Sequence, residues 1–506
     1  MCLDIVITIC DLFTITGESR FLHFLRELRS NLTAVNDSET GLSNTAQPES
    51  PCRTQRKSAH EASDAAVLCS GYEVVVTDSC GQPDFLTLAD ADRLASQLAN
   101  KVRLQQPCSI AVGVHAGARS AMVMLESPGP VLKPGASLVL PAACLTQIFT
   151  ATLIMLAARE GRVSLGDEVH AILPAATRYR ETAFRQVTVR HLLNHTHGLD
   201  DSSLEHVSRR ADARIDVDHL CTCLGSEASL YEPGKMYGNG RAGPYLAAAI
   251  LEELFDQPFE QVLVRRLFDP LGIALRKDPL EDGEICPATG ANLRVSTHDL
   301  LKFLTWHLPQ ARSELAAMYQ DVVAVPGWYL ERGSGLGWRW YGNDWFGHAG
   351  ATSAGSTVVR FDVKHQIAVA LTAKGCNALQ VSAQMFGSAL PDFASFKFPP
   401  RLADDEMASL DLGKYVGCYQ NAATSIHVTC ESRLRLKALM YSRNAASSSC
   451  EPIWKAALYP FKNDLFLTEP RPNGYHLFTH FSRPTTNGYR YLQNGSDLLR
   501  RRGIIH

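Results

Sequence analysis

The stretch PAACLTQIFTATLIMLAAREG, at residues 141–161, indicates which fold class this chain adopts. From Leu145 onward its apolar residues recur at helical spacing, and few of its residues are polar. The pattern predicts a helix that is buried on most sides and ends at Gly161. Backbone N–H groups at the start of such a helix point outward and carry partial positive charge, which suits the nucleophile of an acyl-transfer site. Cys144 occupies that position.

Two segments in this region resemble the signatures of one enzyme superfamily. LTQIFTATLIMLAAREGRVSLGDEVHAILP, at residues 145–174, is similar to the central helix of the serine β-lactamase, penicillin-binding protein and esterase superfamily. VTVRHLLNHTHGLDD, at residues 187–201, is similar to the next signature of these proteins. Their central helix opens with S-x-x-K, whereas here Cys144 and Gln147 stand at the Ser and Lys positions. The chain therefore resembles a divergent member whose two chemical residues have both changed.

The resemblance covers residues 86–390 and implies an α+β fold. It implies an antiparallel sheet built from both ends of the chain, with flanking helices and a helical subdomain. Local patterns agree with this architecture, since they predict a helix at 86–102, a hairpin at 109–127 and three further strands within 334–375. They also predict a helix that follows Thr188 and ends at Gly198, and a near capping box of Ser296 and Asp299 within 289–304. LDLGKYVGCYQ, at residues 410–420, resembles the opening of the small lipocalin-like β-barrel that is often appended to this family.

A chain of 506 residues is long enough for two domains and a smaller element. We predict an N-terminal helical segment at 1–34 and, from its polar composition, a disordered linker at 35–65. Residues 66–399 are assigned to the β-lactamase-like domain, with the core match beginning at 86. Residues 400–506 are assigned to the C-terminal β-barrel domain.

Composition narrows the expected partners and location. The net charge of −3 implies neither a nucleic-acid partner nor an anionic-membrane partner. The apolar N-terminus lacks a basic region, and no stretch reaches the ~18 uncharged apolar residues of a membrane span. The fourteen cysteines form no paired C-x-x-C zinc pattern, which favours reduced thiols in the cytoplasm. The oligomeric state stays open.

No metal or other cofactor is expected. His191 and His195 are four residues apart, which is a spacing that zinc sites use. The corresponding helix of the family carries H-L-L-x-H without a metal, so the resemblance implies structural roles for these histidines.

The resemblance also implies which residues form the site. In the family, Ser attacks a carbonyl carbon and the Lys one turn later helps to remove its proton. The thiol of Cys144 would need less help, because its ordinary pKa is about 8.5. The amide of Gln147 cannot accept a proton and carries no charge. Cys144 as a small buried filler is the alternative that stays open.

Two further motifs of the family have counterparts here. Tyr237-Gly238-Asn239 matches the Y-x-N motif literally, whereas an ungapped alignment puts Asn239 at the Tyr position and Arg241 at the Asn position. His348-Ala349-Gly350 matches the H-x-G strand edge, where Gly allows a ligand to approach closely. By analogy, the N–H groups of Cys144 and Ala351 would form an oxyanion hole. Both alignments of the Tyr motif stay open.

Three functional hypotheses follow. We favour a degenerate member that binds a small acyl or peptide-like ligand with little or no turnover, since nucleophile and base act as a unit. The alternative is an esterase, amidase or transacylase in which Cys144 attacks, with His348 or Tyr237 assisting. In the third hypothesis the pocket is vestigial and the chain acts as a structural or regulatory partner. Whether the chain is an enzyme is left open.

Overall fold

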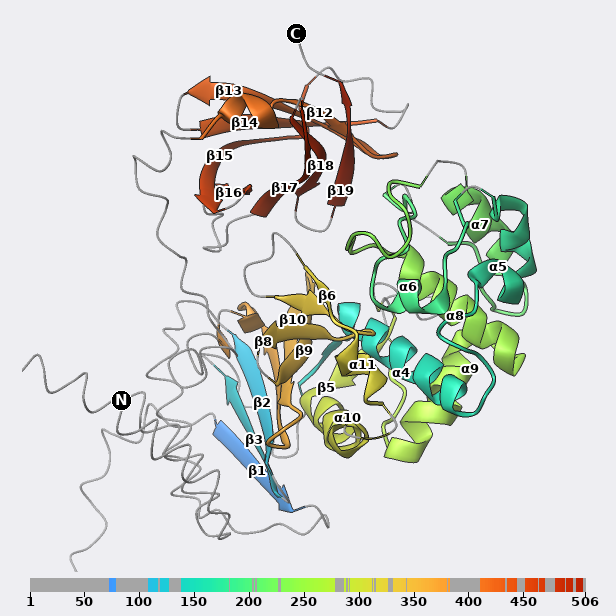
Figure 1. Cartoon of the computed structure of the whole chain (residues 1–506). Coiled ribbons are helices and arrows are strands. Elements are labelled where there is room, and N and C mark those ends of the chain that lie inside the picture. Colours follow the sequence, from blue (N-terminus) through green and yellow to red (C-terminus); the bar gives the residue numbers. More distant parts are fainter. Residues whose placement is uncertain are drawn as a thin grey trace, which may run out of the picture. The chain divides into compact units, whose positions relative to one another are not determined.

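The computed structural model of the chain (Figure 1) describes residues 72–78, 108–116, 119–126, most of 138–382 and most of 410–503. The longer gaps within these ranges are 278–285, 326–330, 444–450 and 469–477. The predicted N-terminal segment, linker and helix at 86–102 lie outside the described residues. The chain divides into two compact units: Met1–Leu140, Ser296–Leu308 and Ala351–Ser395 form the first, and Pro141–Val295, Pro309–Gly350 and Phe396–His506 form the second. The predicted domain boundaries stay predictions.

The first unit contains an antiparallel sheet with strand order β1-β3-β2-β11-β10. Its strands are β1 (Tyr72–Asp78), β2 (Ser109–Ala116), β3 (Arg119–Glu126), β10 (Gly355–Asp362) and β11 (Ile367–Lys374). The predicted hairpin is confirmed, because β2 pairs with β3 throughout its length. Strands from distant parts of the sequence lie side by side, since β2 also pairs with β11.

Helix α10 (Thr297–Gln310) packs on this sheet, where Thr297 Oγ1 and Thr372 Oγ1 lie 2.6 Å apart. The sequence predicts a capping box at its start, and the structure confirms it. Ser296 N–H donates to Asp299 Oδ2 at 2.9 Å, and Asp299 N–H donates to Ser296 Oγ at 3.1 Å. Both N-terminal donors of the helix are therefore satisfied.

The second unit is organised around α4 (Thr146–Arg159), which a 3₁₀ turn, η2 (Ala143–Leu145), precedes. Every residue from Thr146 to Ala157 is buried, and the chain leaves the helix at Gly161, where φ is +70°. The predicted buried helix and its end are confirmed. Hydroxyl groups are accommodated in this apolar setting because Thr150 and Thr152 donate to carbonyls one turn earlier.

Shorter elements surround α4 in the second unit. They are α5 (Val169–Ile172), η3 (Pro174–Tyr179), α6 (Val189–Leu193), α7 (Val217–Gly225), α8 (Ala242–Phe255), α9 (Phe259–Leu263), the π-helix η4 (Val264–Phe268), η5 (Asp269–Leu271) and α11 (Ala317–Gln320). Two further short strands are β4 (Val139–Pro141) and β5 (Arg294–Ser296). Among the helices of the described ranges, none has the length and apolar content that crossing a membrane requires.

Two predicted details are wrong. Helix α6 begins after Thr188 as predicted, but it ends at Leu193 rather than at Gly198, because His195 adopts φ of +58°. The region 334–375 contains four longer strands instead of three, since the chain reverses after Gly342 (φ +116°) and separates β8 (Arg339–Gly342) from β9 (Trp345–Thr352). The second unit has the strand order β9-β8-β7-β6, with β6 (Val323–Ala324) and β7 (Gly333–Ser334).

The C-terminal region forms the predicted all-β barrel, drawn in orange to red in Figure 1. Its closed order is β12-β13-β14-β15-β16-β17-β18-β19. The strands are β12 (Gly417–Gln420), β13 (Thr424–Ser432), β14 (Arg435–Ser442), β15 (Trp454–Lys462), β16 (Leu465–Leu467), β17 (Phe478–Thr485), β18 (Gly488–Asn494) and β19 (Asp497–Gly503), and the 3₁₀ turn η6 (Leu412–Tyr415) precedes them. A buried cluster that includes Tyr415, Tyr419, Phe466 and Phe481 forms the barrel core.

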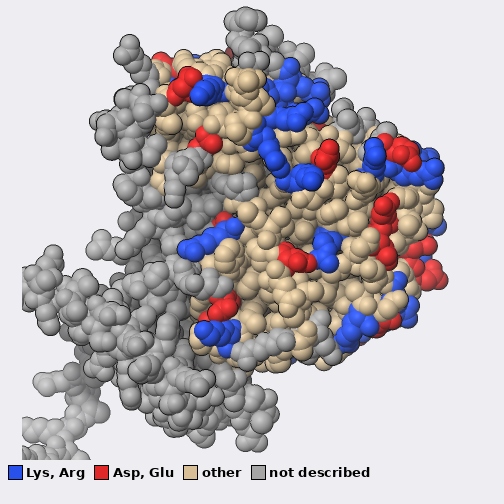
Figure 2. Space-filling view, viewed as in Figure 1, with Lys and Arg blue, Asp and Glu red and all other residues tan. Residues whose placement is uncertain are grey.

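The surface carries charges of both signs. On the face shown in Figure 2, Lys and Arg side chains and Asp and Glu side chains lie in small groups separated by uncharged residues.

Candidate functional site

Cys144 lies in the tight turn η2 immediately before α4, and its side chain is half-buried. Leu145 N–H donates to Ala142 O at 3.1 Å and closes the turn. Ala143 adopts φ of +50°, a conformation that costs a non-glycine residue about 1 kcal/mol. The thiol therefore stands at the start of the buried helix, where the sequence places it.

Two glycines from later parts of the chain, Gly290 and Gly350, lie against this turn. A Cβ atom at Gly290 would lie 2.2 Å from Ala143 O, and one at Gly350 would lie 2.9 Å from Ala143 Cβ. The same Cβ at Gly350 would lie 3.2 Å from Cys144 N. Distances below 3 Å are not tolerated without movement, so both contacts require glycine.

The strand edge around His348 is thus brought against Cys144, as the H-x-G resemblance predicts. His348 lies on β9, is buried, and accepts a hydrogen bond at Nδ1 from Ala349 N–H at 3.0 Å. Ala351 follows on the same strand, is exposed and belongs to the first unit. Its part in an oxyanion hole stays a prediction.

Gln147 lies one turn after Cys144 on α4 and is only 9% exposed. Its neutral amide occupies the place where the family has an ammonium group. A carboxamide neither accepts a proton nor stabilises a thiolate by charge. Gln147 can therefore form hydrogen bonds beside Cys144 but cannot act as a general base.

Arg339 is a buried cation of this site, and sequence reasoning missed it. It lies on β8, is 3% exposed, and donates from Nη1 to Ser334 Oγ at 2.6 Å and from Nη2 to Asn239 Oδ1 at 2.7 Å. Its Cζ lies 5.2 Å from the centroid of the Tyr237 ring, a cation–π geometry. Glu331 is its acidic neighbour, with Oε2 3.4 Å from Nε. The available signal was an arginine between two tryptophans in a strand-like run.

Tyr237 and Asn239 both contact Arg339, as the preceding distances show. Tyr237 is 2% exposed, and its ring meets the His195 ring edge-on at 6.0 Å between centroids. Arg241 is exposed and donates to Leu204 O at 2.9 Å. The structure thus brings the literal Y-x-N to the site, while its alignment with the family's motif stays open.

Burial dominates the proton affinities in this cluster. It raises the pKa of the Cys144 thiol, and the nearby charges of Arg339 and Arg241 oppose the rise. Burial also raises the pKa of Tyr237 above its usual value. It holds the pKa of His195 well below its usual range, and Arg339 lowers that pKa further. At neutral pH the site therefore holds a thiol, a phenol and an uncharged imidazole.

A second thiol, Cys286, lies close to the first. Tyr245 Oη and Cys286 Sγ are 3.0 Å apart, and Gly290 N–H donates to Cys286 O at 2.8 Å. Because Gly290 packs on Ala143, this short loop is held beside the turn that carries Cys144. A charge on Cys286 would raise the pKa of Cys144 further.

An acidic pair supports the loop that carries Asn239. Asp201 Oδ2 accepts from Ala242 N–H at 2.6 Å and so caps helix α8. Burial of its carboxylate, reinforced by the charge of Asp200, raises the pKa of Asp201 to about 6. Hydrogen bonds from backbone N–H groups and the charge of Arg241 oppose the rise. Asp200 Oδ2 accepts from Ala422 N–H, at 2.8 Å, in the turn between β12 and β13.

Of the three histidines on and after helix α6, which are His191, His195 and His197, two have structural roles. His191 Nδ1 accepts from Thr188 N–H at 3.2 Å and completes a capping box. His197 Nδ1 accepts from Leu199 N–H at 3.1 Å. These contacts agree with structural roles rather than with metal binding.

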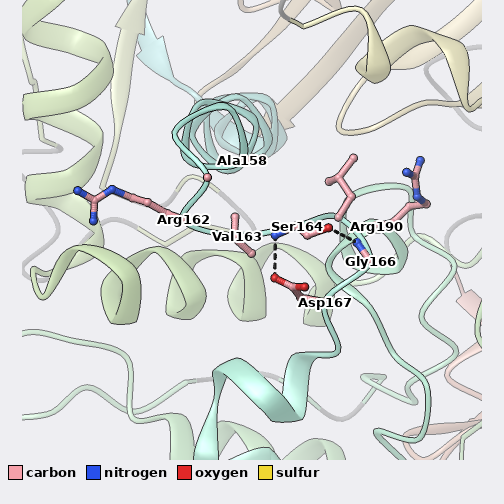
Figure 3. A pocket seen from close by; sticks show the side chains of 9 residues that line it. Ala158, Arg162, Val163, Ser164, Gly166, Asp167 and Arg190 are labelled. Atoms are coloured by element: carbon pink, nitrogen blue, oxygen red, sulfur yellow. Dashed lines mark hydrogen bonds between the residues drawn. The ribbon is translucent and has the colours of Figure 1, made fainter.

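A surface hollow of about 580 Å³ lies elsewhere in the second unit, between the end of α4 and the start of α6 (Figure 3). Arg162 and Arg190 stand at its opposite ends, and the loop between them is closed by a hydrogen bond from Ser164 N–H to Asp167 Oδ2. Arg162 pairs with Glu160, and Arg190 pairs with Asp321. The two cations are thus engaged, and none of the candidate site residues lines this hollow.

Comparison with known proteins finds similarity to beta-lactamases and penicillin-binding proteins. Residues 133–380 match the family model described as Beta-lactamase. Penicillin-binding protein 4 of Amycolatopsis lactamdurans is 23% identical over 326 residues, which cover 56% of this chain and 84% of that protein.

Solved structures agree with this match. The crystal structure of SurE superposes with a TM-score of 0.61 at 20% identity, covering 81% of this chain and 98% of SurE. The structure of SurE with D-Leu gives the same TM-score at 23% identity and covers 82% and 100%. At this level of identity, the likeness concerns the fold.

We predict that Gly350→Ala destabilises the protein by about 1–3 kcal/mol, because the added methyl group would crowd the Ala143 methyl group and the Ala142 carbonyl oxygen. Urea unfolding would measure this loss. Gly166→Ala is the matched control, since the nearest atom to its Cβ would be 3.8 Å away. Equal stability of the two variants would contradict the close packing of β9 on the turn.

Asp201 should make stability depend on pH. Its folded pKa of about 6 exceeds the ordinary 3.8, so its favourable contribution is fully present below about pH 4 and is lost as pH rises through 6. The difference of about 2 pKa units corresponds to roughly 3 kcal/mol. Asp201→Asn keeps an acceptor for Ala242 N–H and should flatten this slope, raising stability at pH 7 in urea titrations.

The control for this experiment is Asp212→Asn, an exposed carboxylate that should leave the slope in place. An Asp201→Asn variant that loses stability at pH 7 and keeps the full slope would contradict the assignment.

Proposed function

Because residues 133–380 match the beta-lactamase family model, we propose that this chain uses the acyl pocket of that family to bind a small acyl or peptide-like ligand with little or no turnover. The observation that carries the proposal is the pairing of Cys144, whose pKa burial raises, with the uncharged amide of Gln147. The nucleophile position therefore holds a protonated thiol, and the base position holds no base.

Other groups near the turn do not replace the missing base. Tyr237 stays protonated at neutral pH, because burial raises its pKa. His195 is uncharged, and its lowered pKa makes it a weak proton acceptor. A guanidinium is not deprotonated in proteins, and Arg339 already donates to Ser334 and Asn239. Since nucleophile and base act together, losing either lowers rates by orders of magnitude.

Binding makes fewer demands on the site than turnover. The half-buried thiol, the Gln147 amide and the Asn239 amide supply polar groups without a free charge. An ester or amide group, which offers a carbonyl acceptor and no net charge, suits these polar groups. The cytoplasmic location expected from the sequence stays a prediction.

The alternative is a Cys-nucleophile esterase, amidase or transacylase. One observation favours it: the charges of Arg339 and Arg241 lower the pKa of Cys144, as a lysine on the helix would. His348, on the strand that packs against the turn, would then be positioned to assist. The alternative requires that, with a substrate bound, these charges lower the pKa of the Cys144 thiol by more than burial raises it.

The deciding experiment compares ester cleavage by the wild type, Cys144→Ala and the double variant Cys144→Ser, Gln147→Lys. With p-nitrophenyl butyrate, we expect background rates for the first two proteins. The double variant restores S-x-x-K and should cleave the ester at least tenfold above background. Thiol-dependent turnover by the wild type, lost in Cys144→Ala but kept in Cys221→Ala, would overturn the proposal in favour of the alternative.

Ligand binding is tested separately. Because a solved structure of SurE carries D-Leu, D-leucine and its amide are the first probes to try. A concentration-dependent rise in Tm, together with protection of Cys144 from iodoacetamide, is the expected result. Protection of Cys221 alone, or no shift with any acyl or peptide-like probe, would instead favour the hypothesis of a vestigial pocket.

The charge of Arg339 is tested through the thiol. Replacing it by Met should raise the pKa that governs alkylation of Cys144 and so lower the alkylation rate at pH 7.5. Glu331→Gln removes the acidic neighbour and should shift the rate the other way or leave it unchanged. Circular dichroism would check that both variants fold. An unchanged rate profile in a folded Arg339→Met would show that the guanidinium does not act on the thiol.

A further inference from the structure

Two thiols meet at one end of the sheet in the first unit, where no function has been assigned. Cys108 immediately precedes β2, and Cys376 follows β11 by two residues. The last cross-strand pair of these two strands is Ser109 with Lys374. The two cysteines therefore flank the same end of one antiparallel ladder.

The chain reverses its course at Gly375, which has φ of +78°. Regular alternation would place Cys376 on the face opposite Cys108, and this left-handed residue breaks the alternation. The segment is then held in place, since Ala378 N–H donates to Ser356 Oγ at 2.8 Å. As a result the Cys376 thiol lies near enough to the Cys108 thiol to act on its pKa as a hydrogen-bond donor, and Cys376 Sγ also lies 4.0 Å from Lys374 O.

The two sulfur atoms have different environments. Cys108 is 6% exposed, whereas Cys376 is partly exposed and reachable from solvent. The hydrogen bond from Cys376 lowers the pKa of Cys108 despite its burial, and the same bond raises the pKa of Cys376. Cys108 is thus the better thiolate, and Cys376 is the accessible thiol. A thiolate beside a second, accessible thiol is the arrangement that thiol–disulfide exchange uses.

We propose that Cys108 and Cys376 form an oxidisable dithiol that closes to a disulfide by exchange with a low-molecular-mass disulfide of the glutathione type. Cys376 first passes its proton to the neighbouring Cys108 thiolate. The Cys376 thiolate then attacks one sulfur of glutathione disulfide and displaces one glutathione thiolate, which takes up a proton from solvent. Cys108 sulfur then attacks Cys376 sulfur, displacing the second glutathione, which takes up the Cys108 proton. Counted from the dithiol, the protein loses two protons and two electrons, and one glutathione disulfide becomes two glutathione thiols.

A disulfide between Cys108 and Cys376 would affect the stability of the protein. It would join the start of β2 to the chain after β11, and these strands lie next to each other inside the order β1-β3-β2-β11-β10. The closed loop would contain more than 250 residues, from Cys108 to Cys376. Cross-links that close long loops restrict the unfolded chain most. The oxidised protein should therefore resist unfolding more than the reduced protein does.

The test equilibrates the full chain with mixtures of reduced and oxidised glutathione and then blocks free thiols with iodoacetamide. Mass spectrometry of tryptic peptides should find the Cys108 peptide joined to the Cys376 peptide. The Tm of the oxidised wild type should exceed that of the reduced wild type by about 4–10 °C. Cys108→Ser and Cys376→Ser should each abolish the joined peptide and reduce this difference.

Cys430→Ser is the matched control, because Cys430 is an exposed thiol on β13, and this variant should keep both effects. The wild-type peptide map does not depend on whether any variant folds. Full alkylation of Cys108 and Cys376 after oxidation, or joining of either one to a different cysteine, would overturn the proposal. So would a rise in Tm that persists undiminished in both serine variants.

Discussion

The close packing of two glycines on the turn at Ala143 is the constraint on which the candidate site depends. Gly290 and Gly350 leave no room for a side chain against the backbone of residues 142–144. The turn can therefore take the left-handed conformation at Ala143 and direct Cys144 to the start of α4. Because α4 is buried along most of its length, it cannot shift to relieve a poor fit at this end. Strand β9 and the loop after Cys286 are fixed by the same contact.

Around this turn, the positive charge comes from a different element than in the family that the sequence resembles. The resemblance leads one to expect a cation on the helix, one turn after the nucleophile, where Gln147 stands. The structure instead places a guanidinium on β8, held by Ser334, Asn239 and Glu331. A charge held so firmly can influence Cys144 through space, but its donors are occupied by protein partners. Such a charge can polarise a bound ligand, but it cannot transfer a proton to or from that ligand.

How far the sequence predicts the structure depends on how local each feature is. The buried helix, the hairpin at β2 and β3, the capping box at Ser296 and the C-terminal barrel follow from periodicity, turn residues and resemblance, and all are present. Arg339 was not predicted, because its contact with Asn239 joins residues that are 100 positions apart. The early end of α6 also escaped prediction, since it depends on the conformation of His195 rather than on Gly198. The roles of Cys144, Gln147, Tyr237 and His348 stay predictions.

The barrel core has a consequence for how this region can diversify. Tyr415 and Tyr489 stack with ring centroids 4.7 Å apart, both hydroxyls reach Asp464, and further aromatic side chains complete the filling. Substitutions toward the axis must conserve volume, whereas outward-facing positions are free to drift. Within the strands described, we therefore expect sequence changes to accumulate at outward-facing positions and in the connecting turns, while the residues of the barrel core stay constrained in size.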